Sequence, residues 1–294
     1  MFGRFGVTDA DLLGRGGESE VFALDAARVL RVYKPGTRHD YLDRRRAFYA
    51  MLSRRRLPFE LPTVLEIGTT GKRLYSVERR MPGRVFSDVL PTLRGADRER
   101  VLASYLRAAE QIGTVELPDQ PFGEILAAGE PLQRDSWSEY LWDRLQQSYR
   151  LSRSDLLRDV PEIEGILAHV RSELRDLERF RERRLVHGDY FPGNVYVSES
   201  FEVSGVGDFG YSTVVGDPRM DLAGAVIFLE VVDGYRREDT AYLRRLLEEQ
   251  RGCDPTRWVA LYRLYYSTYF STCRLDDPPT YAWCVRSLRT WRDE

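Results

Sequence analysis

The first 80 residues carry apolar and polar side chains in short runs, a pattern that predicts strands with one helix between them. Two apolar arms flank a tight polar turn at residues 25–27 and predict a β-hairpin. Residues 39–56 instead place their apolar side chains at helical spacing. A second hairpin is predicted at residues 63–80, with its turn at residues 68–71.

The chain becomes mainly helical from Asp97 onward. Apolar stripes near a period of 3.6 predict helices over residues 97–115, 137–149 and 161–180. Short β-like runs interrupt this pattern at residues 185–210, and helical spacing returns after Gly216. A small patch of strands is therefore expected inside an otherwise helical region.

This order predicts an α+β fold with two lobes. Residues 1–80 form a small β-rich lobe, residues 81–84 a linker, and residues 85–294 a larger, mainly helical lobe. Because ligands favour clefts between domains, we expect the chemistry of the protein where the two lobes meet.

Composition narrows the class of protein. The chain has 44 basic and 46 acidic residues. Because these charges nearly cancel, the composition argues against nucleic acid as a partner. Three cysteines without a CxxC motif and three scattered histidines predict neither a disulfide framework nor a histidine-rich metal site. The longest apolar run, residues 222–232, has about half the length that a membrane span needs. We therefore expect a cytoplasmic protein with no membrane partner.

Two short motifs in the larger lobe carry candidate chemistry. In HGDYFPGNVYV, Asp189 is followed five residues later by Asn194, and in VGDFG a second aspartate, Asp208, ends a strand. Phosphoryl transfer needs a carboxylate that orients the attacking hydroxyl and oxygen ligands that hold Mg²⁺. Each tripeptide alone also occurs in ordinary turns. Their joint spacing between short strands favours the catalytic interpretation.

A glycine-rich turn lies upstream, where G-x-G-x-x-S-x-V spans residues 14–21. Its candidate phosphate-binding residues are Gly14, Gly16, Gly17, Ser19 and Val21. Glycines let the backbone approach phosphates, and amide groups donate hydrogen bonds to them. An ordinary glycine turn would look the same, so the motif gains weight only from its place ahead of a basic strand.

These segments together resemble the aminoglycoside phosphotransferase and choline kinase-like family, which shares the protein-kinase fold. The resemblance is carried in order along nearly the whole chain by LGRGGESEVFAL, HGDYFPGNVYV, GDFG and GDPRMDLAGA. It implies a bilobal kinase-like fold and the transfer of a phosphoryl group from ATP or GTP, with Mg²⁺, to a hydroxyl of a small molecule.

The resemblance also implies roles for residues of the larger lobe. Asp189 would be the catalytic base, and His187 a structural member of the same catalytic loop. Asn194 and Asp208 would ligate Mg²⁺. Asp221, and with it Asp217, would steady the loop, although residues that merely start a helix remain an alternative for both. These two aspartates belong to the GDPRMDLAGA segment.

The family pattern further places the adenine-binding hinge near Glu78, Arg79 and Arg80. It puts Arg31 where the family has a lysine on the third strand. Lys34 is the alternative, but a strand turns it to the opposite face from Arg31. An arginine is not interchangeable with lysine in such a site.

The helix after this strand also departs from the family. The glutamate that usually pairs with the lysine is missing, and Asp43 is the nearest acid. Two alternatives remain for Asp43: it forms an ion pair with Arg31, or it is exposed to solvent. The departure raises an alternative function, a nucleotide-binding regulatory protein of the same fold with impaired catalysis.

The acceptor is less defined by the sequence. Clustered carboxylates would suit a polycation, and the candidates are Glu230, Asp233, Glu238 and Asp239, although a solvated helix end explains them equally. Tyr266 belongs to an aromatic stripe that either packs in the core or stacks on a substrate. We predict a small-molecule O-kinase whose acceptor is an aminoglycoside or similar antibiotic, an amino alcohol or a sugar derivative.

Overall fold

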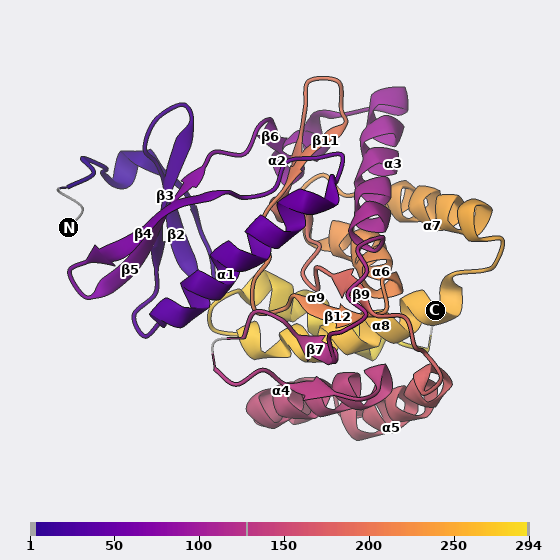
Figure 1. Cartoon of the computed structure of the whole chain (residues 1–294). Coiled ribbons are helices and arrows are strands. Elements are labelled where there is room, and N and C mark those ends of the chain that lie inside the picture. Colours follow the sequence, from indigo (N-terminus) through magenta and orange to yellow (C-terminus); the bar gives the residue numbers. More distant parts are fainter. Residues whose placement is uncertain (1–3, 128, 293–294) are drawn as a thin grey trace.

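In the computed structural model, which describes residues 4–127 and 129–292, an antiparallel sheet forms the core of the smaller lobe (Figure 1). Its strand order is β1-β2-β3-β5-β4. The strands are β1 (Leu12–Arg15), β2 (Ser19–Ala23), β3 (Arg28–Tyr33), β4 (Val64–Thr70) and β5 (Arg73–Arg79). Both predicted hairpins are confirmed, since β2 pairs with β3 and β4 with β5.

The turn of the second hairpin is tighter than predicted. Thr70 pairs with Arg73, so the turn consists of residues 71 and 72, and Gly71 has a φ of +61° that suits glycine. Gly68 lies inside β4 instead, and a Cβ at this position would collide with the ring of Tyr75. This glycine therefore serves side-chain packing, and a turn pattern cannot distinguish the two uses.

Helix α1 (His39–Leu52) packs between the sheet and the larger lobe (Figure 1). A short 3-10 turn (Ser53–Arg55) ends it within the predicted range. Tyr41, Phe48 and Leu52 lie on its buried face, as their helical spacing predicts. Arg45 lies on the same face and is buried as well.

The chain enters the larger lobe soon after β5 ends at Arg79. Strand β6 (Arg84–Val85) already belongs to a three-stranded sheet with the order β11-β10-β6. In this sheet β6 pairs with β10 (Val195–Val197), and β10 pairs in turn with β11 (Val203–Val206). The hairpin formed by β10 and β11 carries the two motifs singled out above, and β6 anchors the crossing segment to it.

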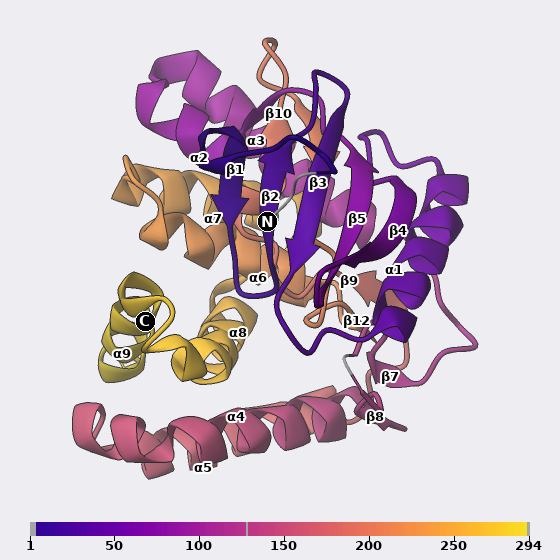
Figure 2. The same ribbon diagram turned by 90° about the vertical axis from the view of Figure 1, so that its left-hand side faces the viewer.

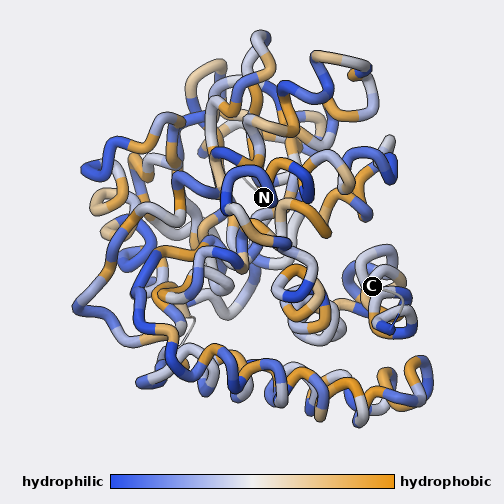
Figure 3. The backbone as a smooth tube through the Cα atoms, turned by 90° about the vertical axis from the view of Figure 1, so that its right-hand side faces the viewer, coloured by the Kyte–Doolittle hydropathy of each residue, from blue (hydrophilic) through white to orange (hydrophobic). Residues whose placement is uncertain are grey.

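Helices make up most of the larger lobe, as predicted. They are α2 (Phe86–Val89), α3 (Gly95–Ile112), α4 (Trp137–Asp159), α5 (Ile163–Leu174), α6 (Arg219–Ile227), α7 (Arg237–Arg251), α8 (Thr256–Tyr269) and α9 (Pro278–Arg289). Figure 2 shows α4 and α5 side by side, beneath α8 and α9. Figure 3 shows hydrophobic positions recurring between hydrophilic ones along these helices, as expected for helices with one buried face. Among the described residues, no helix is both long and apolar enough to cross a membrane.

A second small sheet of the larger lobe has the order β8-β7-β12-β9. Its strands are β7 (Phe122–Glu124), β8 (Gln133–Arg134), β9 (Arg184–Val186) and β12 (Val214–Gly216). Only β9 falls in a run that the sequence pattern predicts as β. The other three are as short as β9 or shorter and lie outside the runs that the pattern predicts as β. Together β9 and β12 flank the catalytic motifs and hold their ends close to each other.

Candidate active site

The two catalytic motifs meet because β10 and β11 are antiparallel neighbours. Val195 pairs with Val206, so the residue before β10 lies beside the residue after β11. The amide of Gly207 donates to the carbonyl oxygen of Asn194 across 2.8 Å. Asp208 follows in a left-handed conformation, with a φ of +60°, which an aspartate tolerates better than most residues. The hairpin therefore brings Asn194 and Asp208 together.

The side chain of Asp221 binds the backbone of the loop that carries Asp189. Its carboxylate, at the start of α6, accepts hydrogen bonds from the amides of His187 at 2.6 Å and Gly188 at 2.9 Å. Gly188 has a φ of +76°, and a Cβ here would collide with the carbonyl oxygen of Ser212. The loop thus makes a sharp turn that a buried carboxylate fixes in place.

The hydrogen bonds of Asp217, in contrast, are made with α6 and α8. It accepts hydrogen bonds from the Tyr262 hydroxyl at 2.9 Å and from the amide of Arg219 at 3.0 Å. Asp217 is therefore a residue of the helix start, tied to α8 by the tyrosine. Of the two aspartates in this motif, Asp221 binds the loop backbone and Asp217 binds α6 and α8. Their spacing in the sequence does not distinguish these roles.

His187 is fully buried beneath the loop. One ring nitrogen, Nε2, lies 2.8 Å from the carbonyl oxygen of Gly207, and the ring packs against Phe209. Burial lowers the pKa of His187 to about 4, so the imidazole is neutral near pH 7. His187 does not line the cleft between the lobes, and its contacts are those of a structural residue that links the two motifs.

Asp189 faces the cleft between the lobes. Burial raises its pKa to about 7, and the nearby carboxylate of Asp208 acts in the same direction. The side-chain amide of Asn194 donates to the carbonyl oxygen of Asp189 at 2.9 Å and thereby fixes the loop around it. A carboxylate with a pKa close to the working pH suits a group that accepts a proton.

Oxygen atoms suited to Mg²⁺ lie next to this carboxylate. The nitrogen of the Asn194 side chain is engaged with Asp189, which leaves its amide oxygen free of that bond, and the side chain of Asp208 is 47% exposed. An amide oxygen and a carboxylate are hard donors of the kind Mg²⁺ prefers. Among the described residues, no three His, Cys, Asp or Glu side chains gather as a metal site. The pair therefore fits an ion that also keeps water and phosphate ligands.

The cleft above these residues has a volume of about 760 Å³. Of the residues predicted from the sequence, it is lined by Gly14, Gly16, Gly17, Ser19, Val21, Arg31, Glu78, Arg79, Arg80, Asp189, Asn194 and Asp208. A Cβ added at Gly14 or Gly17 would meet nothing within 4 Å. The glycine-rich turn thus leaves open space at the cleft that a phosphate group could fill.

Arg31, and not Lys34, is the basic residue of β3 that lines the cleft. Its Nη1 donates to the hydroxyl of Ser19 at 3.0 Å and to Oδ1 of Asp208 at 2.9 Å. Burial opposes the charge of Asp208, but the guanidinium of Arg31 keeps the pKa of that carboxyl below its usual range. Lys34 is exposed to solvent.

The Arg31–Asp43 pair considered from the sequence does not form. Asp43 is half exposed on α1, where it contacts His39 at 3.0 Å and Arg46 at 3.7 Å. Besides Asp208, Arg31 faces a second acid, Glu78 of β5, whose Oε2 lies 3.5 Å from Nε of Arg31. The reason is the register of the sheet, since β3 and β5 are adjacent strands.

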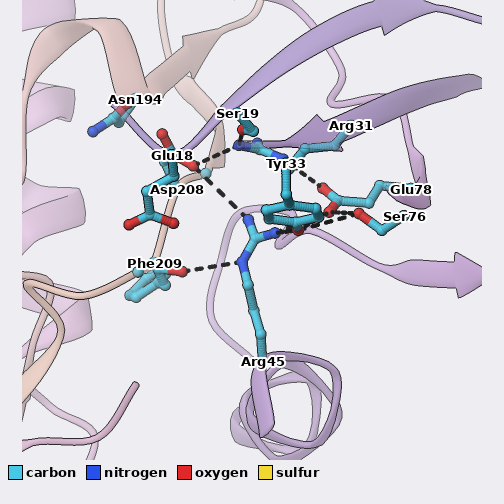
Figure 4. A network of polar contacts seen from close by, with 12 residues as sticks. Glu18, Ser19, Arg31, Tyr33, Arg45, Ser76, Glu78, Asn194, Asp208 and Phe209 are labelled. Atoms are coloured by element: carbon cyan, nitrogen blue, oxygen red, sulfur yellow. Dashed lines mark hydrogen bonds and ion pairs between the residues drawn. The ribbon is translucent and has the colours of Figure 1, made fainter. Parts of the chain in front are cut away.

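Helix α1 contributes a cation to this network in the position where a glutamate was expected. Figure 4 shows Arg45 rising from α1 toward Glu78, next to Arg31. Nη1 of Arg45 lies 3.0 Å from Oε1 of Glu78, and Nε donates to the carbonyl oxygen of Phe209 at 3.3 Å. The sequence analysis predicted neither Arg45 as a partner of Glu78 nor Glu78 as the acid of an ion pair. A charged residue four positions after Tyr41, on the apolar face of the helix, was the available signal.

The residues predicted for the hinge line the cleft, but their polar groups also have partners within the protein. The carboxylate of Glu78 is committed to the two arginines, and the amides of Arg79 and Arg80 donate to the carbonyl oxygens of Thr63 and Ala27. These two amide groups are thus engaged within the smaller lobe. Met81, the next residue along, also lines the cleft.

The acidic substrate pocket considered from the sequence is not assembled. Glu230 forms a two-bond ion pair with Arg263 at 2.6 and 2.8 Å, and Asp239 is bound by Arg98. Asp233 and Glu238 are exposed. Arginines that are remote in sequence neutralise the two acids that are not exposed, which a local charge count cannot foresee.

Tyr266 is a core residue. Its side chain is fully buried and packs edge-on against Phe228. A substrate would have to unpack the core of α8 to touch it, so a direct contact is excluded in this conformation. Tyr211, in contrast, lines both the cleft and a second cavity of about 760 Å³ beside α4. No sequence motif singled out this tyrosine.

Solved structures with this fold include several aminoglycoside phosphotransferases. Aminoglycoside phosphotransferase APH(2'')-Ib with bound ADP matches with a TM-score of 0.63 and 17% identity, over 95% of this chain and 91% of that one. The gentamicin complex of APH(2")-IIa has a TM-score of 0.64 and 17% identity, over 94% and 89%. APH(3'')-Id from Streptomyces rimosus, in complex with ADP and streptomycin, has a TM-score of 0.56 and 14% identity, over 96% and 94%.

These likenesses confirm the kinase-like fold class predicted from the sequence. No curated protein sequence matches the chain. Residues 10–262 match the sequence model of the phosphotransferase enzyme family. This range includes the glycine-rich turn, both catalytic motifs and the start of α8. The chain therefore belongs to the phosphotransferase enzyme family.

Proposed function

We propose that this protein transfers a phosphoryl group from ATP or GTP to a hydroxyl of a small molecule. One observation carries the proposal. Asp189, Asn194 and Asp208 converge on one cleft, opposite a glycine-rich turn that leaves space for phosphates. Family membership and the nucleotide-bound state of the similar solved structures support it.

In this proposal, Asp189 accepts a hydrogen bond from the acceptor hydroxyl and orients it for in-line attack on the terminal phosphorus. Its raised pKa favours uptake of the proton as the new O–P bond forms and the bond to the leaving nucleoside diphosphate breaks. Arg31 directs positive charge toward the phosphate end of the cleft. Asn194 and Asp208 would hold Mg²⁺, which when bound supplies positive charge against the phosphate oxygens.

The acceptor belongs to one of three chemical classes: an aminoglycoside-like antibiotic, an amino alcohol or a sugar derivative. Each offers a hydroxyl on a compact, polar molecule. Similar solved structures are complexes with gentamicin, streptomycin and kanamycin. In this chain Glu230 and Asp239 are already paired with arginines, so a polycation would have to find other acidic partners.

The test compares wild type with Asp189→Asn for transfer from radiolabelled ATP to pooled hydroxylated amines, antibiotics and sugars. We expect acceptor-stimulated turnover in wild type and a loss of about 10³-fold or more in the variant. Binding of Mg·ATP, measured by calorimetry, should persist in Asp189→Asn. Equal turnover in both proteins would exclude Asp189 as the base.

A catalytically impaired, nucleotide-binding regulatory protein is the second candidate. The observation that favours it is the cation that α1 places beside Glu78, where the family pattern has a glutamate. Under this alternative, wild type binds Mg·ATP but shows no turnover with any pool, and Arg31→Lys gains activity. An Arg31→Lys variant that is less active than wild type would exclude it.

A further inference from the structure

The two oxygens of Glu78 have unequal environments. Oε1 accepts hydrogen bonds from Nη1 of Arg45 at 3.0 Å and from the hydroxyl of Ser76 at 2.7 Å. Oε2 faces Nε of Arg31 at 3.5 Å, a distance too long for a good hydrogen bond. Arg45 is therefore the closer cationic partner of this buried carboxylate, although Arg31 lies on the adjacent strand.

Arg31 is, as a result, directed elsewhere. Its Nη1 binds Ser19 and Asp208, and its Nη2 has no hydrogen-bond partner among the residues that the structure describes. The side chain is 14% exposed and lines the nucleotide cleft. A guanidinium with an uncommitted nitrogen at this position is available to a phosphate oxygen.

Arg45 is fully committed to the protein interior. It is 1% exposed and binds Glu78, the hydroxyls of Tyr33 and Tyr49, and the carbonyl oxygen of Phe209. Its Nη2 also lies 3.8 Å from Oδ1 of Asp208, a longer ion pair. Burial alone would raise the pKa of Glu78, but the charges of Arg45 and then of Arg31 hold it below its usual range. A guanidinium buried this deeply cannot reach a nucleotide, so any effect it has on the nucleotide must pass through its neighbours.

We propose that Arg45 is a positioning residue for the nucleotide: by neutralising Glu78, it leaves Nη2 of Arg31 free for a phosphate oxygen. The inference rests on the proposed function, because it assumes that Mg·ATP binds in this cleft. Without Arg45, the buried carboxylate of Glu78 would have Arg31 as its nearest cation. The strong penalty for an unpaired buried charge would then draw the guanidinium of Arg31 away from Ser19 and Asp208.

The experiment measures the Kd of Mg·ATP by calorimetry, together with the midpoint of thermal unfolding, for three variants. Arg45→Met should raise the Kd about tenfold, the loss of one charged hydrogen bond to phosphate. Adding Glu78→Gln removes the carboxylate that captures Arg31, and should return the Kd to within about threefold of wild type. Arg46→Met, one position along on the exposed face of α1, is the matched control and should leave the Kd unchanged.

The double variant R45M/E78Q carries the test even if R45M alone fails to fold, because it buries no unpaired charge. A double variant that folds but binds Mg·ATP about tenfold more weakly than wild type would overturn the proposal, since Arg45 would then act independently of Glu78. A folded R45M with the wild-type Kd would overturn it as well. If wild type itself binds no Mg·ATP, the proposed function fails first, and the inference fails with it.

Discussion

The hydroxyl of Tyr41 donates a hydrogen bond to Oε2 of Glu18 across 2.8 Å and so joins α1 to the glycine-rich turn. The other carboxylate oxygen of Glu18 accepts from the amide of Tyr211 at 3.3 Å. One side chain of the turn thus contacts both the helix and the segment that follows Asp208. We infer that these contacts hold the glycine-rich turn in the position from which it binds the phosphates of a nucleotide.

Replacing Tyr41 by phenylalanine should therefore weaken nucleotide binding without changing any charge. The lost hydrogen bond is worth about 1 kcal/mol, which corresponds to a rise of about fivefold in the Kd of Mg·ATP. Calorimetric titration of Tyr41→Phe with Mg·ATP measures this. Tyr242→Phe, a substitution of the same kind on α7, serves as the control and should bind as wild type does. If Tyr41→Phe binds equally well or more tightly, the contact does not hold the turn in its binding position.

That the proposed catalytic residues lie together could be predicted from the sequence because their spacing is local. Asp189 and Asn194 lie in the loop before β10, and Asp208 follows β11, so that a single hairpin places all three. The chemistry of that loop also restricts which residue types are useful there. The order of residues over a short segment was therefore enough to predict where the proposed catalytic site lies.

The partners of the buried charges could not be predicted in this way. Glu78 and Arg45 are far apart in the sequence and meet only through the packing of α1 on the sheet. Because Glu78 lies at the hinge, its position suggested nucleotide contact, whereas its carboxylate is an ion-pair partner. The same limit applies to the arginine that neutralises Glu230, since no local pattern indicates which distant side chain will reach a buried acid.

Asp221 should give the protein a stability that depends on pH. Burial raises its folded-state pKa to about 7, whereas the unfolded carboxyl titrates near its ordinary value of 3.8. Between these two values the folded protein keeps a proton that the unfolded chain has lost, so the free energy of unfolding falls as the pH rises from about 4 to about 7. Asp221→Asn removes this titration.

Urea denaturation of wild type and Asp221→Asn between pH 5 and pH 8 measures the effect. Asparagine cannot accept both amide hydrogen bonds equally well, so the variant should be less stable at pH 5. The gap should narrow up to about pH 7 and then level off toward pH 8, because only wild type loses stability through Asp221 and the carboxyl is deprotonated in both states above its folded-state pKa. Asp189 is present in both proteins and contributes a common slope. Two curves that stay parallel across this range would show that Asp221 does not titrate there.

Glu230 offers a test of whether the acids near the end of α6 bind substrate or stabilise the fold. Its carboxylate is held by Arg263 and by the indole nitrogen of Trp283 at 3.0 Å, and the side chain of Arg263 is only 5% exposed. Removing one partner of a buried ion pair is strongly destabilising, so Glu230→Gln should lower the free energy of unfolding by about 3 kcal/mol.

The exposed Asp233 is the matched comparison for this substitution. Asp233→Asn should change the free energy of unfolding by no more than about 0.5 kcal/mol, because the side chain is exposed to solvent. Urea denaturation of the two variants gives both values, and the KM for a cationic acceptor distinguishes a binding role. A Glu230→Gln protein with wild-type stability and a KM raised for cationic acceptors alone would return this carboxylate to the substrate site. The ion pair with Arg263 predicts the opposite, a loss of stability with no preference among acceptors.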